Sequence, residues 1–234
     1  MVNAYSHHFY GHIENEVKRY LVTLLLEPAR FHNNTRDLTG RIMSRLAYDD
    51  APQGPQKVDI SIEMLTQMSV SGPIVNAVTP LWHIADFIRY NPWRKFEVQR
   101  EAKLKAWWLN LFRVARARFL RGELPSDTWS YRYFEGVVKD GNPEIELSAK
   151  DEEMGSCMIG FQCLVGVVTL SGPMLFFLMS MALHPEWLKK CQEEIDRVCG
   201  DRAPTVHDFP NIPTVRACIK ETIRWRSGVP LGML

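Results

Sequence analysis

Residues 220–226 read KETIRWR, and no other short run in this chain is as informative. On a helix, residues three apart share a face, so Glu221 and Arg224 can form a charge-assisted ion pair. A single pair of this kind is common on solvated helices and contributes little to stability. The run predicts a helix over residues 214–226, and its functional meaning depends on the motifs that accompany it.

Two further motifs precede this run. Residues 183–186 read LHPE and residues 192–196 read QEEID. In this order and spacing, the three motifs resemble the cytochrome P450 superfamily of haem-thiolate monooxygenases, most closely the type used in fungal secondary metabolism. The resemblance runs with varying strength along the chain. It implies a mainly α-helical fold, with residues 1–234 as a single partial domain that forms the middle helical portion of the family fold, truncated at both ends.

The resemblance also implies a haem cofactor, held in the family by a Cys in a loop well after the ExxR helix. That Cys is absent from the given sequence, so we expect the chain as given to lack the haem ligand and to be inactive by itself. In the family, the pair equivalent to Glu221 and Arg224 is buried and is completed by a later Arg. An uncompensated buried charge costs about 3–5 kcal/mol, so we expect the pair to be exposed here or the chain to be unstable.

The central uncharged run, residues 154–183, predicts one long helix. Thirty positions without a charged residue satisfy the length rule for a transmembrane helix, which is the alternative interpretation. Small and polar residues such as Gly160, Gln162 and Ser171 are distributed all round the helix, which favours a helix buried among others. The resemblance implies the same, since the family's central helix is buried throughout.

Within this run, residues 165–169 read VGVVT and align with the family's oxygen-binding motif. The resemblance implies that Gly166 supplies the small position through which oxygen approaches and that Thr169 supplies the hydroxyl that relays protons. The family's acidic residue is replaced by Val168, which can neither accept nor donate a proton. Pro173 removes the helical hydrogen bond to the carbonyl of Thr169, so a bend is expected there.

Helical periodicity dominates the rest of the chain. Apolar residues recur at three and four positions over 13–25, and Pro28 ends this helix. A second helix is expected over 38–46, with Asn33, Asn34 and Thr35 as candidate caps. Residues 49–56, DDAPQGPQ, predict a loop, and a long helix is expected over 93–120.

The long run over 93–121 interleaves nine basic residues with aromatic and apolar ones. A basic amphipathic helix of this composition can lie on an anionic membrane or bind a partner protein. The same pattern also describes a packed helix with a solvated charged face, which we consider the stronger interpretation. The whole chain carries 28 Lys plus Arg against 27 Asp plus Glu, so its net charge does not indicate a nucleic-acid partner.

No protein-ligated metal site is predicted. His8 and His12 are four residues apart, but no Glu lies between them in the HExxH manner and no third ligand is indicated. The five cysteines show no CxxC spacing, which indicates reduced thiols and neither a zinc site nor a disulfide framework. They are Cys157, Cys163, Cys191, Cys199 and Cys218.

Two hypotheses about function are consistent with these motifs. In the first, the intact protein is an oxidoreductase that hydroxylates a lipophilic small molecule in secondary-metabolite biosynthesis, with NADPH–cytochrome P450 reductase as its electron donor. The family then implies an intracellular location at the surface of the endoplasmic reticulum membrane, although the first residues, MVNAYSHHFYG, contain neither a signal peptide nor an anchor. In the second, the chain is a non-catalytic remnant that acts as a helical binding protein or a single-span membrane-associated protein.

Overall fold

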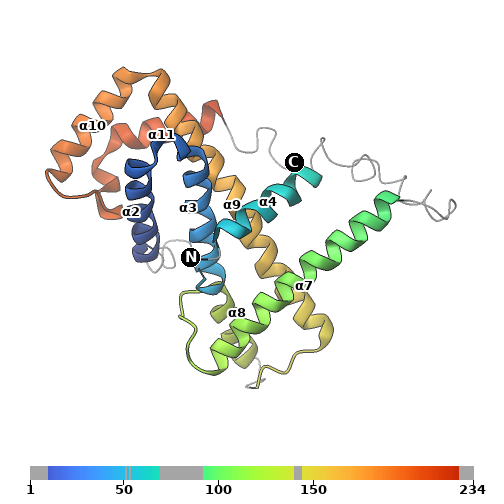
Figure 1. Ribbon diagram of the computed structural model, residues 1–234. Helices are drawn as coiled ribbons and strands as arrows, with labels where there is room; N and C mark the ends of the chain where they lie inside the picture. Colours follow the sequence, from blue (N-terminus) through green and yellow to red (C-terminus); the bar gives the residue numbers. More distant parts are fainter. Residues whose placement is uncertain (1–9, 51, 53, 69–91, 140–143, 227–234) are drawn as a thin grey trace. The chain divides into compact units, whose positions relative to one another are not determined.

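The computed structural model describes residues 10–50, 52, 54–68, 92–139 and 144–226. All regular elements within these ranges are helices, which confirms the mainly α-helical class (Figure 1). They are α2 (Tyr10–Leu26), η1 (Pro28–Arg30), α3 (Phe31–Tyr48), α4 (Gly54–Met68), α7 (Pro92–Leu120), α8 (Trp129–Lys139), α9 (Ala149–Leu183), α10 (Pro185–Cys199), η3 (Val206–Asn211) and α11 (Pro213–Trp225).

The chain divides into two compact units. The first consists of Met1–Thr39 and Gly166–Leu234, and the second of Gly40–Val165. Both boundaries fall inside helices, so α3 and α9 each contribute residues to both units. The prediction of a single partial domain over residues 1–234 stays a prediction, because two units joined by continuous helices do not define separate domains.

The core of the second unit is built from aromatic side chains of α7 and α8. Phe112 and Phe134 are both fully buried, with ring centroids 5.0 Å apart, and Phe119 lies 5.6 Å from Phe134. A neighbouring cluster joins Met64 of α4, Trp108 of α7 and Leu164 of α9. Burial of each such side chain stabilises the fold by about 1.5–3 kcal/mol, so these contacts hold α4, α7, α8 and the first half of α9 together.

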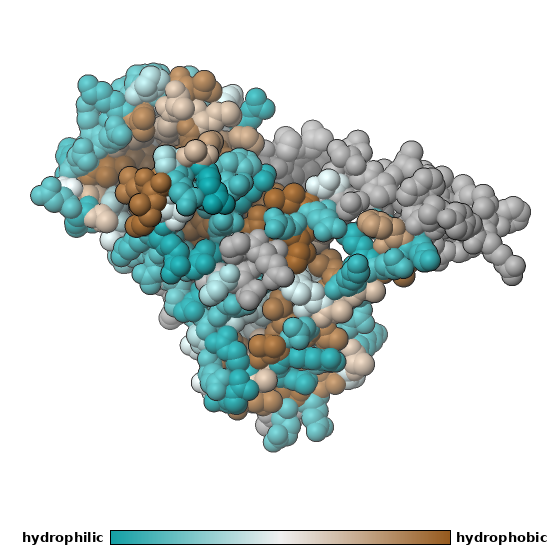
Figure 2. All heavy atoms as spheres, viewed as in Figure 1, coloured by the Kyte–Doolittle hydropathy of each residue, from teal (hydrophilic) through white to brown (hydrophobic). Residues whose placement is uncertain are grey.

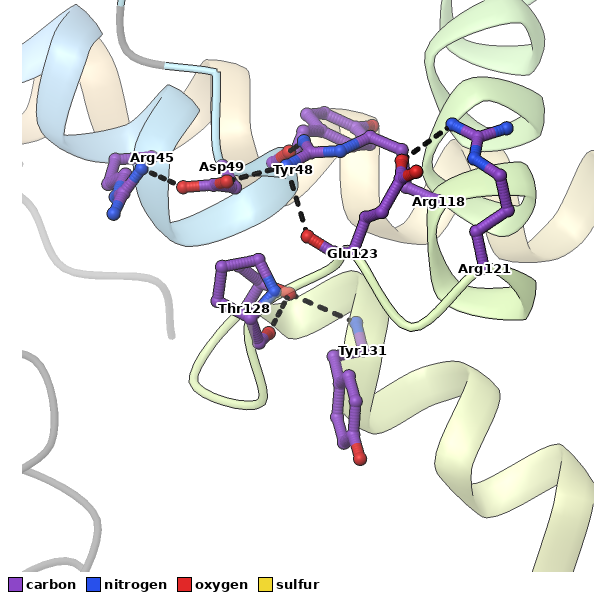
Figure 3. Close-up of polar contacts among 9 residues, drawn as sticks. Arg45, Tyr48, Asp49, Arg118, Arg121, Glu123, Thr128 and Tyr131 are labelled. Atoms are coloured by element: carbon purple, nitrogen blue, oxygen red, sulfur yellow. Dashed lines mark hydrogen bonds and ion pairs between the residues drawn. The ribbon is translucent and has the colours of Figure 1, made fainter.

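In the second unit, polar contacts join the end of α3 to the end of α7, close to the start of α8 (Figure 3). Arg118 donates to the backbone carbonyl of Tyr48 over 3.0 Å and to the Asp49 carboxylate over 2.6 Å. Asp49 has a φ of 57°, the left-handed conformation that an Asp tolerates at a helix end. Thr128 then caps α8 by accepting the N–H of Tyr131 over 3.2 Å.

The predicted helices are present, with two corrections at their ends. The second predicted helix begins at Phe31, directly after η1, so Asn33, Asn34 and Thr35 lie inside α3 and do not cap it. The Thr35 hydroxyl instead donates to the carbonyl of Phe31 over 2.7 Å. The loop predicted over 49–56 is too long, because α4 already begins at Gly54. The expected end of the first helix at Pro28 and the long helix over 93–120 are confirmed.

Helix α9 is longer than predicted and is not buried throughout. It runs over Ala149–Leu183 with Pro173 inside it, and 28% of its most apolar window is buried. The buried positions recur every three or four residues, for example Ile159, Cys163 and Val167, so neighbouring helices cover one stripe. The expectation of complete burial was wrong because uniform apolar composition does not show how many faces are covered.

By length and composition α9 is also the one helix in the described part of the chain that could cross a membrane. The same test is met by the core helix of a water-soluble protein, so composition alone does not choose between the two interpretations. The bend expected near Thr169 stays a prediction.

Gly160 tests the packing of the second unit. A Cβ added at Gly160 would lie 2.3 to 2.6 Å from three atoms of the Trp108 indole, whereas a Cβ at Gly136 of α8 meets nothing within 4 Å. We expect Gly160→Ala to lower the free energy of unfolding by about 1–3 kcal/mol through overpacking. Gly136→Ala should leave it unchanged or raise it by up to about 1 kcal/mol through helix propensity.

Urea denaturation followed by tryptophan fluorescence and by far-UV circular dichroism measures both variants. Equal effects of the two substitutions would contradict the close packing of α9 against Trp108. The comparison is internally controlled, since both changes add one methyl group to a helical glycine.

Candidate functional site

The candidate site in the first unit is built on three consecutive elements, α10, η3 and α11. Pro185 and Pro213 stand at the first position of α10 and of α11, where a missing N–H costs no helical hydrogen bond. Gly200, with a φ of 59°, ends α10. A capping box between Thr205 and Asp208 begins η3, so the chain returns to α11 along a defined path.

A single carboxylate joins α10 to α11. Glu194 accepts the hydroxyl of Thr214 over 2.8 Å and the N–H of Val215 over 3.0 Å. Val215 lies in the first turn of α11, whose N–H groups have no partner within the helix, so Glu194 acts as a cap from a neighbouring helix. Burial acts to raise the pKa of the Glu194 carboxyl, but the hydrogen bonds from Val215 and Thr214 outweigh it, and the pKa is lowered.

A second tie joins α11 to the end of α9. The Ser180 and Thr222 hydroxyls lie 3.2 Å apart and both are buried. Thr222 stands directly after Glu221, so this contact sets the rotation of α11 at the position of the predicted ion pair.

The predicted Glu221–Arg224 pair is present. The guanidinium binds the carboxylate through two hydrogen bonds, Nε to Oε2 over 2.8 Å and Nη2 to Oε1 over 2.5 Å. The hydrogen bonds from Arg224 lower the pKa of the Glu221 carboxyl. The two side chains are 61% and 73% exposed, so of the two alternatives that the sequence left open the exposed one holds.

Helix α11 borders two apolar grooves. The larger groove measures about 480 Å³ and is lined by Ser180, Met181, His184, Trp187, Ala217, Cys218, Glu221, Thr222 and Trp225. The smaller groove measures about 320 Å³ and is lined by Tyr20, Pro173, Met174, Phe177, Leu178, Val215, Ile219, Thr222 and Ile223. Figure 2 shows hydrophobic residues in brown among hydrophilic ones over the part of this face where α2, α10 and α11 lie.

The predicted oxygen-binding residues lie in the middle of α9. Thr169 is exposed, while Gly166 and Val168 are half-buried. Thr169 stands four residues before Pro173, which lines the smaller groove, so the two share a face of α9. Ser180, the residue that contacts α11, follows Thr169 by eleven positions, or about 16 Å along a helix. The ion pair and the oxygen-binding residues therefore do not form one cluster.

Many of the positive charges of helix α7 are neutralised by ion pairs. Many of its basic side chains are paired with carboxylates within the second unit: Arg100 with Glu97, Lys105 with Glu101 and Glu153, Arg113 and Arg116 with Glu152, and Arg118 with Asp49. Such pairing neutralises much of the positive charge that would attract an anionic membrane. It favours the packed helix with a charged face over the membrane-binding interpretation.

Sequence reasoning missed a buried lysine in the second unit. Lys57 of α4 is completely buried, its ammonium donates to the Ser44 hydroxyl, and it lies 3.6 Å from the Asp50 carboxylate. Burial lowers the pKa of Lys57. A Ser–Lys pair is a known nucleophile arrangement, but both side chains are fully enclosed, so this cluster holds α3 and α4 together and meets no substrate.

A family model described as "Cytochrome P450" matches residues 56–233, which include most of α4, all of α9 and the Glu221–Arg224 pair. The chain belongs to the cytochrome P450 family. This confirms the resemblance deduced from the LHPE, QEEID and KETIRWR motifs.

Three relatives illustrate the family match. The cytochrome P450 monooxygenase virE of Hypocrea virens is 43% identical over 82 residues, which cover 35% of this chain and 15% of that protein. The cytochrome P450 monooxygenase psoD of Aspergillus fumigatus is 38% identical over 140 residues, which cover 53% of this chain and 26% of that protein. A cytochrome P450 monooxygenase of Armillaria gallica is 28% identical over 220 residues, which cover 90% of this chain and 40% of that protein. The chain thus spans less than half the length of these relatives.

Three of the cysteines in the described part of the chain have raised pKa values. The reactive form of a Cys is the thiolate, which a low pKa favours. Burial instead raises the pKa of Cys163 to about 12 and that of Cys191 to about 11, and burial also raises the pKa of Cys157. Cys157, Cys163 and Cys191 are therefore neutral thiols near pH 7. In the part of the chain that the structure describes, no three His, Cys, Asp or Glu side chains form a metal-binding group.

His12 lies in α2, but His8 lies outside the described residues. The structure therefore describes only one residue of this pair. The roles predicted for Gly166 and Thr169 likewise stay predictions, because they rest on the family motif alone.

Replacement of Glu194 tests the tie between α10 and α11. Glu194→Ala removes the acceptor for Thr214 and for the Val215 N–H, so we expect a lower thermal unfolding midpoint at neutral pH. Glu193→Ala is the matched control, since Glu193 is exposed and its ion pair with Lys189 is long, at 3.8 Å. It should change the midpoint little.

The Glu194 effect should also depend on pH. Because the pKa of Glu194 is lower in the folded state than in the unfolded chain, its contribution is present above the unfolded value of about 4.3 and is lost as pH falls through the lowered folded value. The midpoints of Glu194 and Glu194→Ala proteins, measured by circular dichroism, should therefore converge in acid. A difference that stays constant down to about pH 2 would contradict a role of the ionised carboxylate.

Proposed function

We propose that this chain is part of a haem-dependent monooxygenase that hydroxylates a lipophilic small molecule in fungal secondary metabolism. The observation that carries the proposal is the family match over residues 56–233, which includes the VGVVT motif on α9 and the bidentate Glu221–Arg224 pair on α11. Haem, when bound, supplies the activation of molecular oxygen. The residues of this chain shape the apolar surroundings and deliver protons.

The chemistry of α9 supports a lipophilic substrate. In the second unit, Met154, Met158 and Phe161 follow each other at helical spacing and are 59%, 55% and 46% exposed. Such an exposed apolar stripe binds other apolar surfaces and discriminates against charged molecules.

Thr169 and Val168 define how the site handles protons. The Thr169 hydroxyl can accept a proton and donate one, whereas Val168, where the family has an acid, can do neither. In the proposal, protons therefore reach the Thr169 oxygen from water and not from a neighbouring carboxylate. General acid assistance typically contributes about 10²–10⁴-fold, so this substitution should slow proton delivery.

The redox partner and the location belong to the same proposal. Cytochrome P450 enzymes of this kind receive electrons from NADPH through a flavoprotein reductase, and we propose such a reductase as the partner of the intact protein. We also propose the surface of the endoplasmic reticulum membrane as its location. The many ion pairs on α7 make that helix a weak candidate for the membrane contact.

One observation favours a second candidate function. Helix α9 is uncharged from Met154 to Leu183, and much of its surface is not covered by the described residues. An uncharged stretch of this length is also what a non-catalytic protein needs if this helix crosses a membrane. Protease protection of chain inserted into microsomes separates the two, because only a spanning α9 places its two ends on opposite sides.

The catalytic proposal is tested on the protein expressed from its natural transcript together with a P450 reductase. The reduced protein should show the carbon monoxide band typical of thiolate-ligated haem and should oxidise lipophilic compounds in an NADPH-dependent manner. A protein that folds but shows no such band overturns the proposal.

The roles of Val168 and Thr169 are tested in the same assay. Val168→Asp places a proton donor beside Thr169, so it should raise the amount of product formed per NADPH consumed. Thr169→Ala removes the hydroxyl and should lower this ratio, while Thr169→Ser keeps the hydroxyl and is the matched control. If Val168→Asp and Thr169→Ala both leave the ratio unchanged, these residues do not occupy the oxygen-binding positions.

A further inference from the structure

Two cysteines of the first unit lie side by side on different helices. The Sγ atoms of Cys191 on α10 and Cys218 on α11 are 3.6 Å apart. Cys191 is 4% exposed, whereas Cys218 is half-buried and lines the larger groove beside Glu221. Twenty-six residues separate the two cysteines in the sequence, so only the packing of α10 on α11 brings them together.

The register of the two helices holds the sulfur atoms in place. Glu194, one turn after Cys191, contacts the N–H of Val215, one turn before Cys218. Residue numbers thus rise along α10 as they fall along α11, which describes antiparallel helices with Cys191 opposite Cys218. The Ser180–Thr222 contact adds a second anchor one turn further along α11. Ties on both sides of Cys218 keep its side chain within reach of Cys191.

The two sulfur atoms are separated by somewhat more than the length of a disulfide bond. A disulfide requires about 2.05 Å, so the present 3.6 Å must shorten by about 1.5 Å. Shared between the two side chains, this is a movement of less than about 1 Å for each sulfur. The short distance between the sulfur atoms makes this pair the candidate for a disulfide between α10 and α11.

We propose that Cys191 and Cys218 form a redox-active dithiol, which a hydroperoxide converts into a disulfide between α10 and α11. The sulfur of Cys218, a residue that lines the larger groove, attacks the peroxide oxygen, forms a sulfenic acid and releases water from hydrogen peroxide. The Cys191 sulfur then attacks the Cys218 sulfur, the sulfur–oxygen bond breaks, and the hydroxide leaves with the Cys191 proton as a second water. Two thiols lose two electrons in total, and hydrogen peroxide gains them.

The environment of each thiol fits these separate roles. Cys218 borders the groove of about 480 Å³, through which a small peroxide can enter. Burial raises the pKa of Cys191 to about 11, which keeps it a thiol until its neighbour is oxidised. Cys191 thus serves as the resolving residue next to an accessible Cys218.

The disulfide acts on the helix that carries the ion pair. Cys218 stands three residues before Glu221, so both lie on one face of α11, and the bond fixes this face to α10. A dithiol reductant reverses the reaction. The redox state of the pair thereby sets how freely α11 can move relative to α10, independently of any haem.

Peptide mapping of the purified protein tests the proposal. The protein is treated with hydrogen peroxide, free thiols are alkylated, and a digest is analysed with and without reduction. We expect a peptide containing Cys191 linked to one containing Cys218, absent after reduction with dithiothreitol. The oxidised protein should also unfold at a higher temperature, by several degrees, because the closed loop restricts the unfolded chain.

Single substitutions separate the roles of the two sulfurs. In Cys191→Ser, the Cys218 sulfenic acid should accumulate and be trapped by dimedone, whereas in Cys218→Ser the dimedone adduct at position 191 should be absent. Cys199→Ser is the matched control, since Cys199 is a buried thiol of the same helix and should leave the link between 191 and 218 unchanged. Alanine replaces serine if a variant fails to fold.

The result that overturns the proposal is recovery of both Cys191 and Cys218 as alkylated thiols after peroxide treatment that oxidises the surface methionines. A link from either cysteine to Cys199 would overturn it as well. These readouts are covalent and need no substrate, reductase or haem. Failure of the dithiol proposal is therefore distinguishable from failure of the monooxygenase proposal.

Discussion

The long helix α9, uncharged from Met154 to Leu183, is the constraint on which both units depend. Over this stretch it offers neighbouring helices only apolar, small and neutral polar side chains, so hydrophobic burial and close packing hold it there. Its charged first turns are held by ion pairs such as Arg113–Glu152. In the second unit, Gly160 permits the Trp108 indole to approach the α9 backbone. In the first unit, the buried Ser180 hydroxyl meets Thr222 of α11. Each unit thus uses a small residue of α9 as the point where another helix comes close.

Local chemistry explains which parts of the fold could be predicted from the sequence. Helical periodicity and proline positions act within a few residues, so the end of α2 before Pro28 and the extent of α7 were predictable. Side-chain caps compete with other local contacts, and the assignment of Asn33, Asn34 and Thr35 failed because η1 already turns the chain at Phe31. The coverage of α9 was not predictable, since its small and polar residues are distributed all round the helix and mark no single buried face.

In the candidate site, contacts within one helix could likewise be predicted from the sequence, whereas contacts between helices could not. The Glu221–Arg224 pair forms between residues one turn apart, so its geometry follows from the helix and could be predicted from KETIRWR. The Glu194 cap and the Cys191–Cys218 contact depend on the register of two helices joined by η3, which no short motif encodes. Glu194 belongs to the quoted QEEID run, so the motif marked the residue without showing which atoms it binds.

The exposed Glu221–Arg224 pair forms without help from any other segment of the chain. Because Arg224 reaches Glu221 within one helical turn, the two hydrogen bonds form whether or not another segment covers them. The pair therefore indicates that this segment is helical and, together with the other motifs, that the chain belongs to the family. Its exposure, at 61% and 73%, leaves its free carboxylate lone pairs and N–H groups in contact with water, which avoids the penalty of an uncompensated buried charge. If the pair were buried, a third partner would have to satisfy the remaining carboxylate lone pairs and N–H groups, because the desolvation of two charges is otherwise not compensated.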